Sequence, residues 1–300
     1  MQKHLPTFHT YSIKDLELLS NIKAHTLRIW EQRYGILQPN RTDTNIRTYS
    51  DADLRHLLNV SMLNQHGFKI SHIASMSKEE IEEQVRGITE ELELQDDQVT
   101  MLVIAMLDLD EDAFCKVLDE VKAKKTFEAM VIELLYPFME KVGNLWTTGS
   151  VSPVQEHFVS NIIRHKLISE IVQTPRVVRN ASPKFLLFTP ENELHEIALL
   201  FYYYLLKVRQ YDVVYIGINI PLYDLVTVFE HHQPEYIVSS FTVHPNKDKI
   251  KTYLDSLSGH FPKSSILLSG YQIRNYRQEL PLNVKKIENV TEFIHLIQKS

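Results

Sequence analysis

Between residues 184 and 300, short apolar runs alternate with longer amphipathic runs, and this alternation constrains the fold more than any other feature. Apolar runs of strand length begin at Phe185, Val213, Tyr236, Ser265 and Val284. Because consecutive parallel strands need a long crossover, usually a helix, the pattern predicts a Rossmann-like open parallel α/β sheet of about five strands. The first crossover helix is expected from Leu194 to Val208. Ligands on such sheets bind at the carboxyl ends of the strands.

Residues 98–175 carry apolar side chains at helical spacing. Helical runs surround Leu102 and Leu118 and extend over residues 127–146 and 153–173. Four helices of this length with short connections predict an antiparallel four-helix bundle. The stretch from Thr174 to Pro183, which is bounded by prolines, is interpreted as a linker.

The connection between the last two of these helices contains several residues that matter for function. Ser152 is a suitable N-cap, and Gln155 can close a capping box. Glu156 and His157 are therefore expected in the first turn of a helix, near Trp146. Because a helix N-terminus disfavours a protonated imidazole, His157 is expected to stay neutral and able to bind a metal. Taken alone, a histidine at a helix start is more often a surface or core residue.

The net charge of −6 hides an uneven distribution along the chain. Residues 1–50 carry seven Lys or Arg and four Asp or Glu, a net charge of +3. Residues 78–97 carry two and nine, a net charge of −7. A basic head favours an anionic partner. The acidic stretch is interpreted as a solvated helix or a hinge between domains.

Cys115 is the only cysteine, so the chain forms no internal disulfide and no multi-cysteine metal site. Its apolar helical surroundings predict a packed thiol rather than a ligand. The N-terminus lacks a signal-like apolar core, and no run has the length of a membrane span. The expected location is the cytoplasm, without membrane attachment.

Residues 1–77 predict a small helical head. Short helices are expected after Tyr11, from Lys23 to Tyr34, and from Ser50 to about Gln65, and the first two are spaced as a helix-turn-helix. The segments YSIKDL (11–16), TLRIWEQRYG (26–35), PNRT (39–42) and NIRTYSDADL (45–54) resemble the MerR family of transcription regulators.

This resemblance implies a winged helix-turn-helix that binds double-stranded operator DNA, with the second helix in the major groove. Wing residues would donate to phosphate oxygens, whereas Thr26 and Arg28 are the candidates for groove contacts. The candidate DNA-binding residues are Thr26, Arg28, Arg33, Tyr34, Arg41, Arg47 and Tyr49. Composition alone would instead favour a small helical domain with a solvated basic face.

Glu193 and His195 follow the first predicted strand, on the loop where a ligand would lie. Glu193 can hold one imidazole nitrogen and so determine the tautomer, as partners of metal-binding histidines commonly do. The loop resembles that of the cobalamin-binding domain, in which an acid-x-His-x-x-Gly motif supplies the lower cobalt ligand. The resemblance implies that later segments line the slot for the nucleotide tail, namely Ser240, Thr242, Ser269 and Gly270.

In this order, the head, the bundle and the sheet resemble the light-responsive, cobalamin-dependent MerR-type repressors. The resemblance implies that adenosylcobalamin binds between bundle and sheet, with His195 below cobalt and with Trp146 and Glu156 around the adenosyl group. It also implies that light cleaves the cobalt–carbon bond and that His157 takes the vacated upper position. The homo-oligomer, a dimer or tetramer, would then loosen and release DNA.

Two departures from the cobalamin pattern leave alternatives open. Ala198 and Ser269 stand where relatives carry glycine, and close-packed slots respond to a single added group. One alternative is therefore a cobalamin-free regulator that senses another ligand or protein. The other is a corrinoid carrier in methyl transfer, against which the head argues. The sequence shows no nucleophile–base pair, phosphate loop or paired carboxylates, so we expect no enzyme activity.

Overall fold

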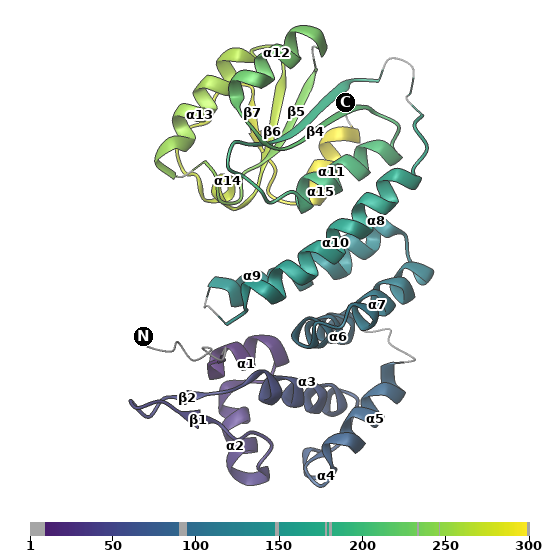
Figure 1. The fold of residues 1–300 in the computed structure, drawn as a ribbon, viewed down its shortest axis with the longest axis vertical. Helices are drawn as coiled ribbons and strands as arrows, with labels where there is room; N and C mark the ends of the chain where they lie inside the picture. The colour runs from purple at the N-terminus through teal and green to yellow at the C-terminus, as the bar shows by residue number, and fades with distance from the viewer. Residues whose placement is uncertain are drawn as a thin grey trace, which may run out of the picture. The chain divides into compact units, whose positions relative to one another are not determined.

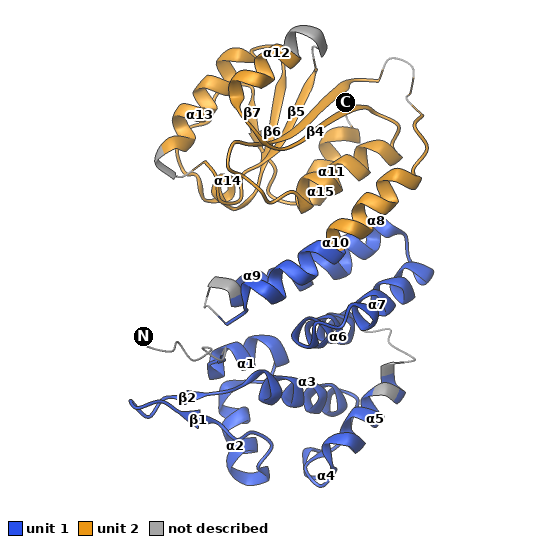
Figure 2. Cartoon of the chain, in the orientation of Figure 1, with its two compact units in different colours: residues 1–162 blue, residues 163–300 orange. Residues whose placement is uncertain are grey.

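The computed structural model describes residues 10–89, 95–147, 150–177, 179, 182–232, 234–245 and 247–298. The side chains of a few helical residues, Trp146 among them, lie outside this description. The chain divides into two compact units, residues 1–162 and residues 163–300, and each unit is described by itself (Figure 2).

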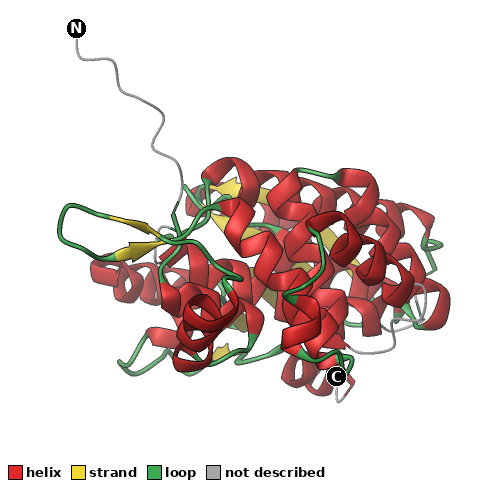
Figure 3. Cartoon of the chain, turned by 90° about the horizontal axis from the view of Figure 1, so that it is seen from below, coloured by secondary structure: helices red, strands yellow, loops and turns green. Residues whose placement is uncertain are grey.

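The head consists of α1 (Ile13–Ser20), α2 (Ala24–Tyr34), α3 (Asp51–Gln65) and the short α4 (Ile70–Ile73). Ser12 and Ser50 form capping boxes at the starts of α1 and α3, so local sequence explains both helix starts. Strands β1 (Asn40–Arg41) and β2 (Arg47–Thr48) pair antiparallel and form the projecting hairpin visible in Figure 3. The three predicted helices and the implied wing are confirmed.

Of the two interpretations of the acidic stretch, a solvated helix or a hinge, its described part fits the helix, because most of its side chains are exposed. Helix α5 (Lys78–Thr89) buries Ile81 and Val85, which are 2% and 4% exposed, and it packs against α3. The burial of these two residues was not anticipated, because four glutamates lie close to them in the sequence. Residues 90–94 lie outside the described residues.

The helical middle begins with α6 (Gln95–Asp108) and α7 (Glu111–Lys124), and the Asp110 side chain caps the start of α7. Helix α8 (Phe127–Met130) continues through a π-helical turn, η1 (Val131–Leu135), into α9 (Tyr136–Thr147). Phe114 and Phe138 meet edge to face, with ring centroids 5.4 Å apart. Cys115 is partly buried in α7.

Helix α10 (Pro153–Gln173) is the fourth predicted helix, and it runs from the first unit into the second. Only its first part, up to Ile162, therefore belongs with α6, α7 and α9. No helix in the described part of the chain is long and apolar enough to cross a membrane.

The second unit contains a parallel sheet of five strands, as predicted, and the structure gives the strand order as β4-β3-β5-β6-β7. Helices α12 and α13 cover one face, and α11 and α15 cover the other (Figure 1). The short helix α14 was not expected. The strands are β3 (Lys184–Pro190), β4 (Asp212–Ile220), β5 (Tyr236–Ser240), β6 (Ser265–Ser269) and β7 (Val284–Lys286). The helices are α11 (Ile197–Val208), α12 (Leu222–His232), α13 (Lys247–His260), α14 (Tyr271–Asn275) and α15 (Val290–Gln298).

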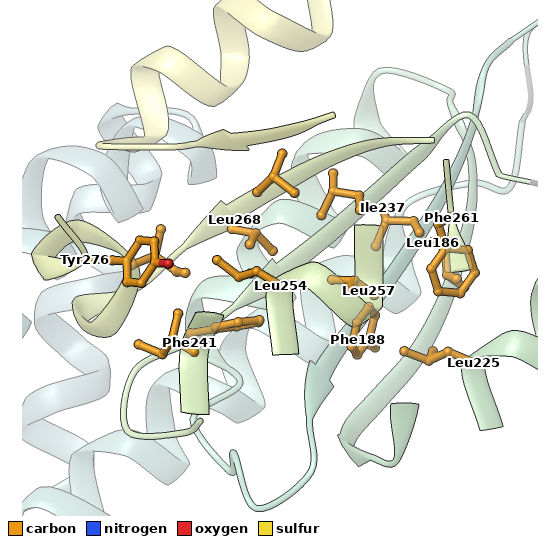
Figure 4. Close-up of a cluster of buried hydrophobic side chains, with 14 residues drawn as sticks. Leu186, Phe188, Leu225, Ile237, Phe241, Leu254, Leu257, Phe261, Leu268 and Tyr276 are labelled. Carbon is orange, nitrogen blue, oxygen red and sulfur yellow. The ribbon is translucent and has the colours of Figure 1, made fainter. Parts of the chain in front are cut away.

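The core of the sheet on the α13 side is a continuous apolar cluster (Figure 4). Phe188, Ile237 and Leu268 from the strands pack with Leu254 and Leu257 of α13, and each is fully buried. This core holds the strands in register, and the strand order reverses between β3 and β5. The loops after these two strands therefore face the crevice in which open α/β sheets bind ligands.

Candidate functional site

The loop that follows β3 carries His195 at the carboxyl edge of the sheet. Helix α11 begins at Ile197 rather than at Leu194, so Leu194 to Glu196 remain in the loop. The Nδ1 atom of His195 lies 2.6 Å from Glu193 Oε1, and the His195 backbone N–H donates to the same oxygen over 2.9 Å. The expected contact between the two residues is present. The His195 side chain is 56% exposed, whereas that of Glu193 is 0% exposed.

The second carboxylate oxygen of Glu193 binds the loop after β5. Three consecutive backbone N–H groups, those of Thr242, Val243 and His244, donate to Oε2 over 2.8, 2.6 and 3.0 Å. Burial by itself would raise the pKa of Glu193, but the hydrogen bonds from His195 and these amides outweigh burial and lower the pKa to about 2. Glu193 is therefore an anion at neutral pH.

An ionised Glu193 determines which nitrogen of His195 can bind a metal. A carboxylate only accepts hydrogen bonds, so Nδ1 of His195 carries the proton and Nε2 carries the lone pair. A metal-binding imidazole commonly donates its other N–H to a carboxylate in this way. The exposed ring of His195 thus has the donor chemistry of a metal ligand.

Buried hydroxyls lie at the end of β5, beside this loop. Ser239 and Ser240 are 0% and 1% exposed, and within the described residues their Oγ atoms have no hydrogen-bond partner. A buried hydroxyl without a partner is costly, so a polar group of a ligand at this edge would stabilise it. The Ser240 hydroxyl is therefore suited to bind a polar group of a ligand, and the Ser239 hydroxyl shares this property although Ser239 was not among the expected slot residues. Thr242 is partly exposed.

Ser269 is the last residue of β6, and Gly270 follows it at the start of α14. The structure gives a second explanation for the glycine at position 270. Gly270 has φ +97°, and a Cβ atom there would lie 2.4 Å from the Phe241 carbonyl oxygen. The Phe241 N–H also donates to the Ser269 carbonyl over 2.9 Å. Contact between two loops of this chain therefore requires glycine at position 270, with or without a ligand. Ser269 is buried and Ala198, in the first turn of α11, is partly exposed.

Sequence reasoning missed a polar cluster that holds the other side of the His195 loop. Glu196 forms an ion pair with Arg164 of α10 and accepts a hydrogen bond of 2.8 Å from the Tyr215 hydroxyl. Burial, followed by the contact with Glu196, raises the pKa of Tyr215. Exposed apolar residues were missed too, because exposure depends on the fold. Leu194, Val243 and Tyr271, on the loops after β3 and β5 and at the start of α14, are 64%, 44% and 56% exposed.

The start of α10 is capped as expected. The Ser152 N–H donates to Gln155 Oε1 over 3.1 Å, and Ser152 Oγ accepts from the Val154 N–H over 3.1 Å. Glu156 Oε2 lies 2.8 Å from Nδ1 of His157, whose side chain is 73% exposed. This turn belongs to the first unit and His195 to the second. Trp146 lies in α9, but its side chain is outside the described residues.

The candidate groove residues lie on α2. Leu27 and Trp30 are buried, as predicted, which leaves Arg28 and Arg33 exposed and Thr26 partly exposed. The Arg33 guanidinium lies over the ring of Tyr34, 5.5 Å from its centroid. Arg28 and Arg33 are therefore exposed cations on the second helix, five positions apart.

The remaining candidates lie on or beside the wing, and they differ in exposure and in contacts. Arg41 is exposed and donates to Asn45 Oδ1 over 2.7 Å, whereas Arg47 forms an ion pair of 3.0 Å with Glu31 of α2. Tyr49, expected beside phosphates, is 0% exposed, so this expectation of a surface phosphate donor was wrong. Its backbone pairs with Tyr11, which turns the side chain inward, and burial raises its pKa to about 12.

Two separate stretches of the chain match known protein families. Residues 11–80 match the MerR HTH family regulatory protein family, and residues 99–168 match the B12 binding domain. The chain is 28% identical over 260 residues to the HTH-type transcriptional repressor CarH of Myxococcus xanthus. This alignment covers 85% of this chain and 86% of CarH. The chain is 27% identical over 235 residues to the repressor CarA of the same organism, covering 77% and 76%.

A third relative and a solved structure match over smaller parts or at lower identity. The regulator MlrA of Salmonella typhimurium is 33% identical over 84 residues, which cover 28% of this chain and 35% of that protein. The monomethylamine corrinoid protein of Methanosarcina barkeri has a TM-score of 0.55 at 14% identity, covering 65% of this chain and 94% of that one, and this likeness supports the fold. The chain therefore combines a MerR-type helix-turn-helix domain with a B12-binding domain.

Proposed function

We propose that this protein is a transcription regulator, acting as a repressor, whose operator affinity is controlled by adenosylcobalamin and by light. The observation that carries the proposal is the order of the two domains on one chain, together with a similar repressor over most of its length. The Glu193–His195 pair supports it independently, because it presents an imidazole suited to cobalt at the ligand edge of the sheet.

In the proposed complex with DNA, α2 enters the major groove and the wing lies on the backbone. Arg28, Arg33 and Thr26 are the base-reading candidates, and Arg41 is the best placed phosphate contact because it is exposed. Arg47 would act mainly by joining the wing to α2 through Glu31. Tyr34 would position Arg33 through their stacking contact.

In the proposed complex with cobalamin, His195 would bind cobalt through Nε2. The tail would enter beside Ser240, Thr242, Ser269 and Gly270, where the buried Ser240 hydroxyl gains a partner. Trp146 and Glu156 remain the proposed contacts of the cofactor's adenosyl group, and His157 is the proposed ligand that would replace this group. The cofactor would supply a cobalt–carbon bond that visible light cleaves, and the chain would answer with a change of homo-oligomeric state and of operator affinity.

Two other functions remain candidates. A cobalamin-free regulator is favoured by Ala198, whose methyl group stands in the first turn of α11 where relatives of this fold carry glycine. A corrinoid carrier in methyl transfer is favoured by the fold it shares with the Methanosarcina barkeri protein. The MerR-type head argues against the carrier, since a carrier has no use for a DNA-binding domain.

An absorption spectrum tests the proposal directly. Purified protein is mixed with adenosylcobalamin in the dark, desalted, and measured before and after green light, with His195→Ala as the matched variant. We expect a retained corrinoid band that changes on illumination, and a different lower-ligand signature in the variant. Loss of the colour on desalting in the dark would remove cobalamin from the proposal and leave the cobalamin-free regulator.

A further inference from the structure

Among the described residues, contacts at two places join the head to the helical middle, and the second of these involves the connection between α9 and α10. At the first place, α3 meets α6 through an ion pair between Arg55 and Asp108 and a contact of 2.8 Å between His66 and Asp97. At the second place, α1 packs against α9. The Ser150 hydroxyl donates to Asp15 Oδ2 there over 2.9 Å, across 135 positions of the chain.

This second contact is buried and tightly connected at both ends. Asp15 and Ser150 are 4% and 3% exposed. Asp15 Oδ2 also accepts from the backbone N–H and the hydroxyl of Ser12, so the same oxygen caps the start of α1. The Ser150 N–H donates to the Leu145 carbonyl near the end of α9 over 2.9 Å. A hydrogen bond to a buried carboxylate is among the strong ones, so the contact resists independent movement of the two parts.

The contact lies between the two candidate functional regions of the first unit. On one side, Ser150 is two residues before Ser152, the cap of the helix turn that carries Glu156 and His157. On the other side, α1 packs against α2, the candidate recognition helix. A displacement of the α9–α10 connection would therefore reach α2 through one hydrogen bond and one helix–helix contact.

We propose that the Asp15–Ser150 hydrogen bond is an internal latch through which the Glu156–His157 turn controls the orientation of the DNA-binding head. The latch couples the two regions because a turn that moves must either carry α1 with it or break this bond. The difference in operator affinity between two states of the turn depends on that bond, since allosteric coupling needs a contact that differs between the states. This inference rests on the proposed control of operator affinity by cobalamin.

The test compares three full-length variants on an operator duplex that wild-type protein selects from random DNA. Ser150→Ala removes the latch hydroxyl. Ser20→Ala removes another buried hydroxyl of the head, which donates within α1 to the Leu16 carbonyl. Asp108→Asn weakens the other junction between head and helices. Operator affinity is measured in the dark with and without adenosylcobalamin, and bound cobalamin is measured by absorbance.

We expect Ser150→Ala to retain cobalamin while the ratio of the two operator affinities falls at least about 5-fold, the lower end of typical allosteric coupling. Ser20→Ala and Asp108→Asn should keep the wild-type ratio within about 2-fold. An unchanged ratio in Ser150→Ala, or an equal fall in Ser20→Ala, would overturn the latch.

A second measurement separates failure of the latch from failure of the proposed function. Hydrogen exchange of cofactor-free protein reports the contact whether or not cobalamin is the ligand. Ser150→Ala should speed exchange in the first turn of α1, whereas Ser20→Ala should act near its own position at the end of α1. If cobalamin does not change the operator affinity of wild-type protein but Ser150→Ala speeds exchange in the first turn of α1, the proposed function is wrong and the latch is supported. If Ser150→Ala leaves the first turn of α1 unchanged, the latch is absent.

Discussion

A glutamate organises each candidate functional region, but the two glutamates are held differently. In the head, Glu31 accepts hydrogen bonds from the Arg47 and Tyr49 side chains over 3.0 and 3.4 Å, so both of these links to the recognition helix run through side chains. In the sheet unit, Glu193 is fully buried and binds three successive backbone amides as well as His195. Side-chain contacts let a wing adjust to DNA, whereas backbone contacts hold an imidazole in one place.

This difference gives a general expectation about the two regions. Partners of metal-binding histidines raise affinity by orienting the ligand before the metal arrives. Phosphate contacts tolerate more movement, because they position a protein on DNA without reading its sequence. Substitutions at Glu193 should therefore have larger effects than substitutions in the wing, and the following experiments test that ranking.

The largest effect is expected for Glu193→Gln. A neutral glutamine amide has one acceptor oxygen and no negative charge, so it cannot accept all the hydrogen bonds that the two Glu193 oxygens accept now. The loop after β5 and the tautomer of His195 therefore lose the group that stabilises them. We expect adenosylcobalamin affinity to fall by about 10–100-fold, measured by spectral titration in the dark. Operator binding by the cofactor-free protein serves as the control and should stay unchanged. A variant that binds cobalamin as tightly as wild type would contradict the role of Glu193.

The next effect concerns stability in acid. The pKa of Glu193 is about 2 in the folded chain against an ordinary 4.5, so its contribution is present above the ordinary pKa and is lost as pH falls toward 2. The expected loss in the free energy of unfolding is on the order of 3 kcal/mol. Denaturant unfolding of wild type and Glu193→Gln over this pH range isolates it as a difference between the two proteins. Parallel curves would mean that Glu193 is not held as an anion.

A smaller effect is expected for Arg41→Ala in the wing. Because Arg41 is exposed, its loss should remove one phosphate contact and leave the fold intact. Operator affinity should fall by about tenfold, uniformly across sequences. The slope of log affinity against log salt concentration should fall by about one, which corresponds to the loss of one phosphate contact. Fluorescence anisotropy at several salt concentrations measures both. A changed sequence preference with an unchanged salt dependence would instead indicate base contact.

The smallest effect is expected for Tyr49→Phe. The hydroxyl makes a long contact of 3.4 Å with Glu31, and the ring stays buried after substitution. Stability should change by no more than about 1 kcal/mol, and operator affinity should remain near that of wild type. An affinity loss as large as that of Arg41→Ala would show that Tyr49 reaches DNA after a rearrangement of the head.

Local patterns in the sequence were enough to predict many features of this protein. The capping boxes at Ser12 and Ser50 depend on residues three positions apart, so both helix starts could be predicted. The Glu193–His195 contact spans two positions and was expected for the same reason. The parallel sheet followed from alternating runs, because each strand and each crossover helix has its own period of apolar residues.

Other features depend on tertiary structure, because they arise between residues far apart in the chain. The burial of Tyr49 depends on pairing with Tyr11, and the requirement for Gly270 depends on the approach of Phe241. The Asp15–Ser150 contact joins positions separated by 135 residues, and no local sequence pattern predicts it. The sequence by itself determined the elements and the chemical types at the candidate sites, since these follow from short-range propensity and spacing. Packing alone decided which side chains are covered and which parts of the chain are joined.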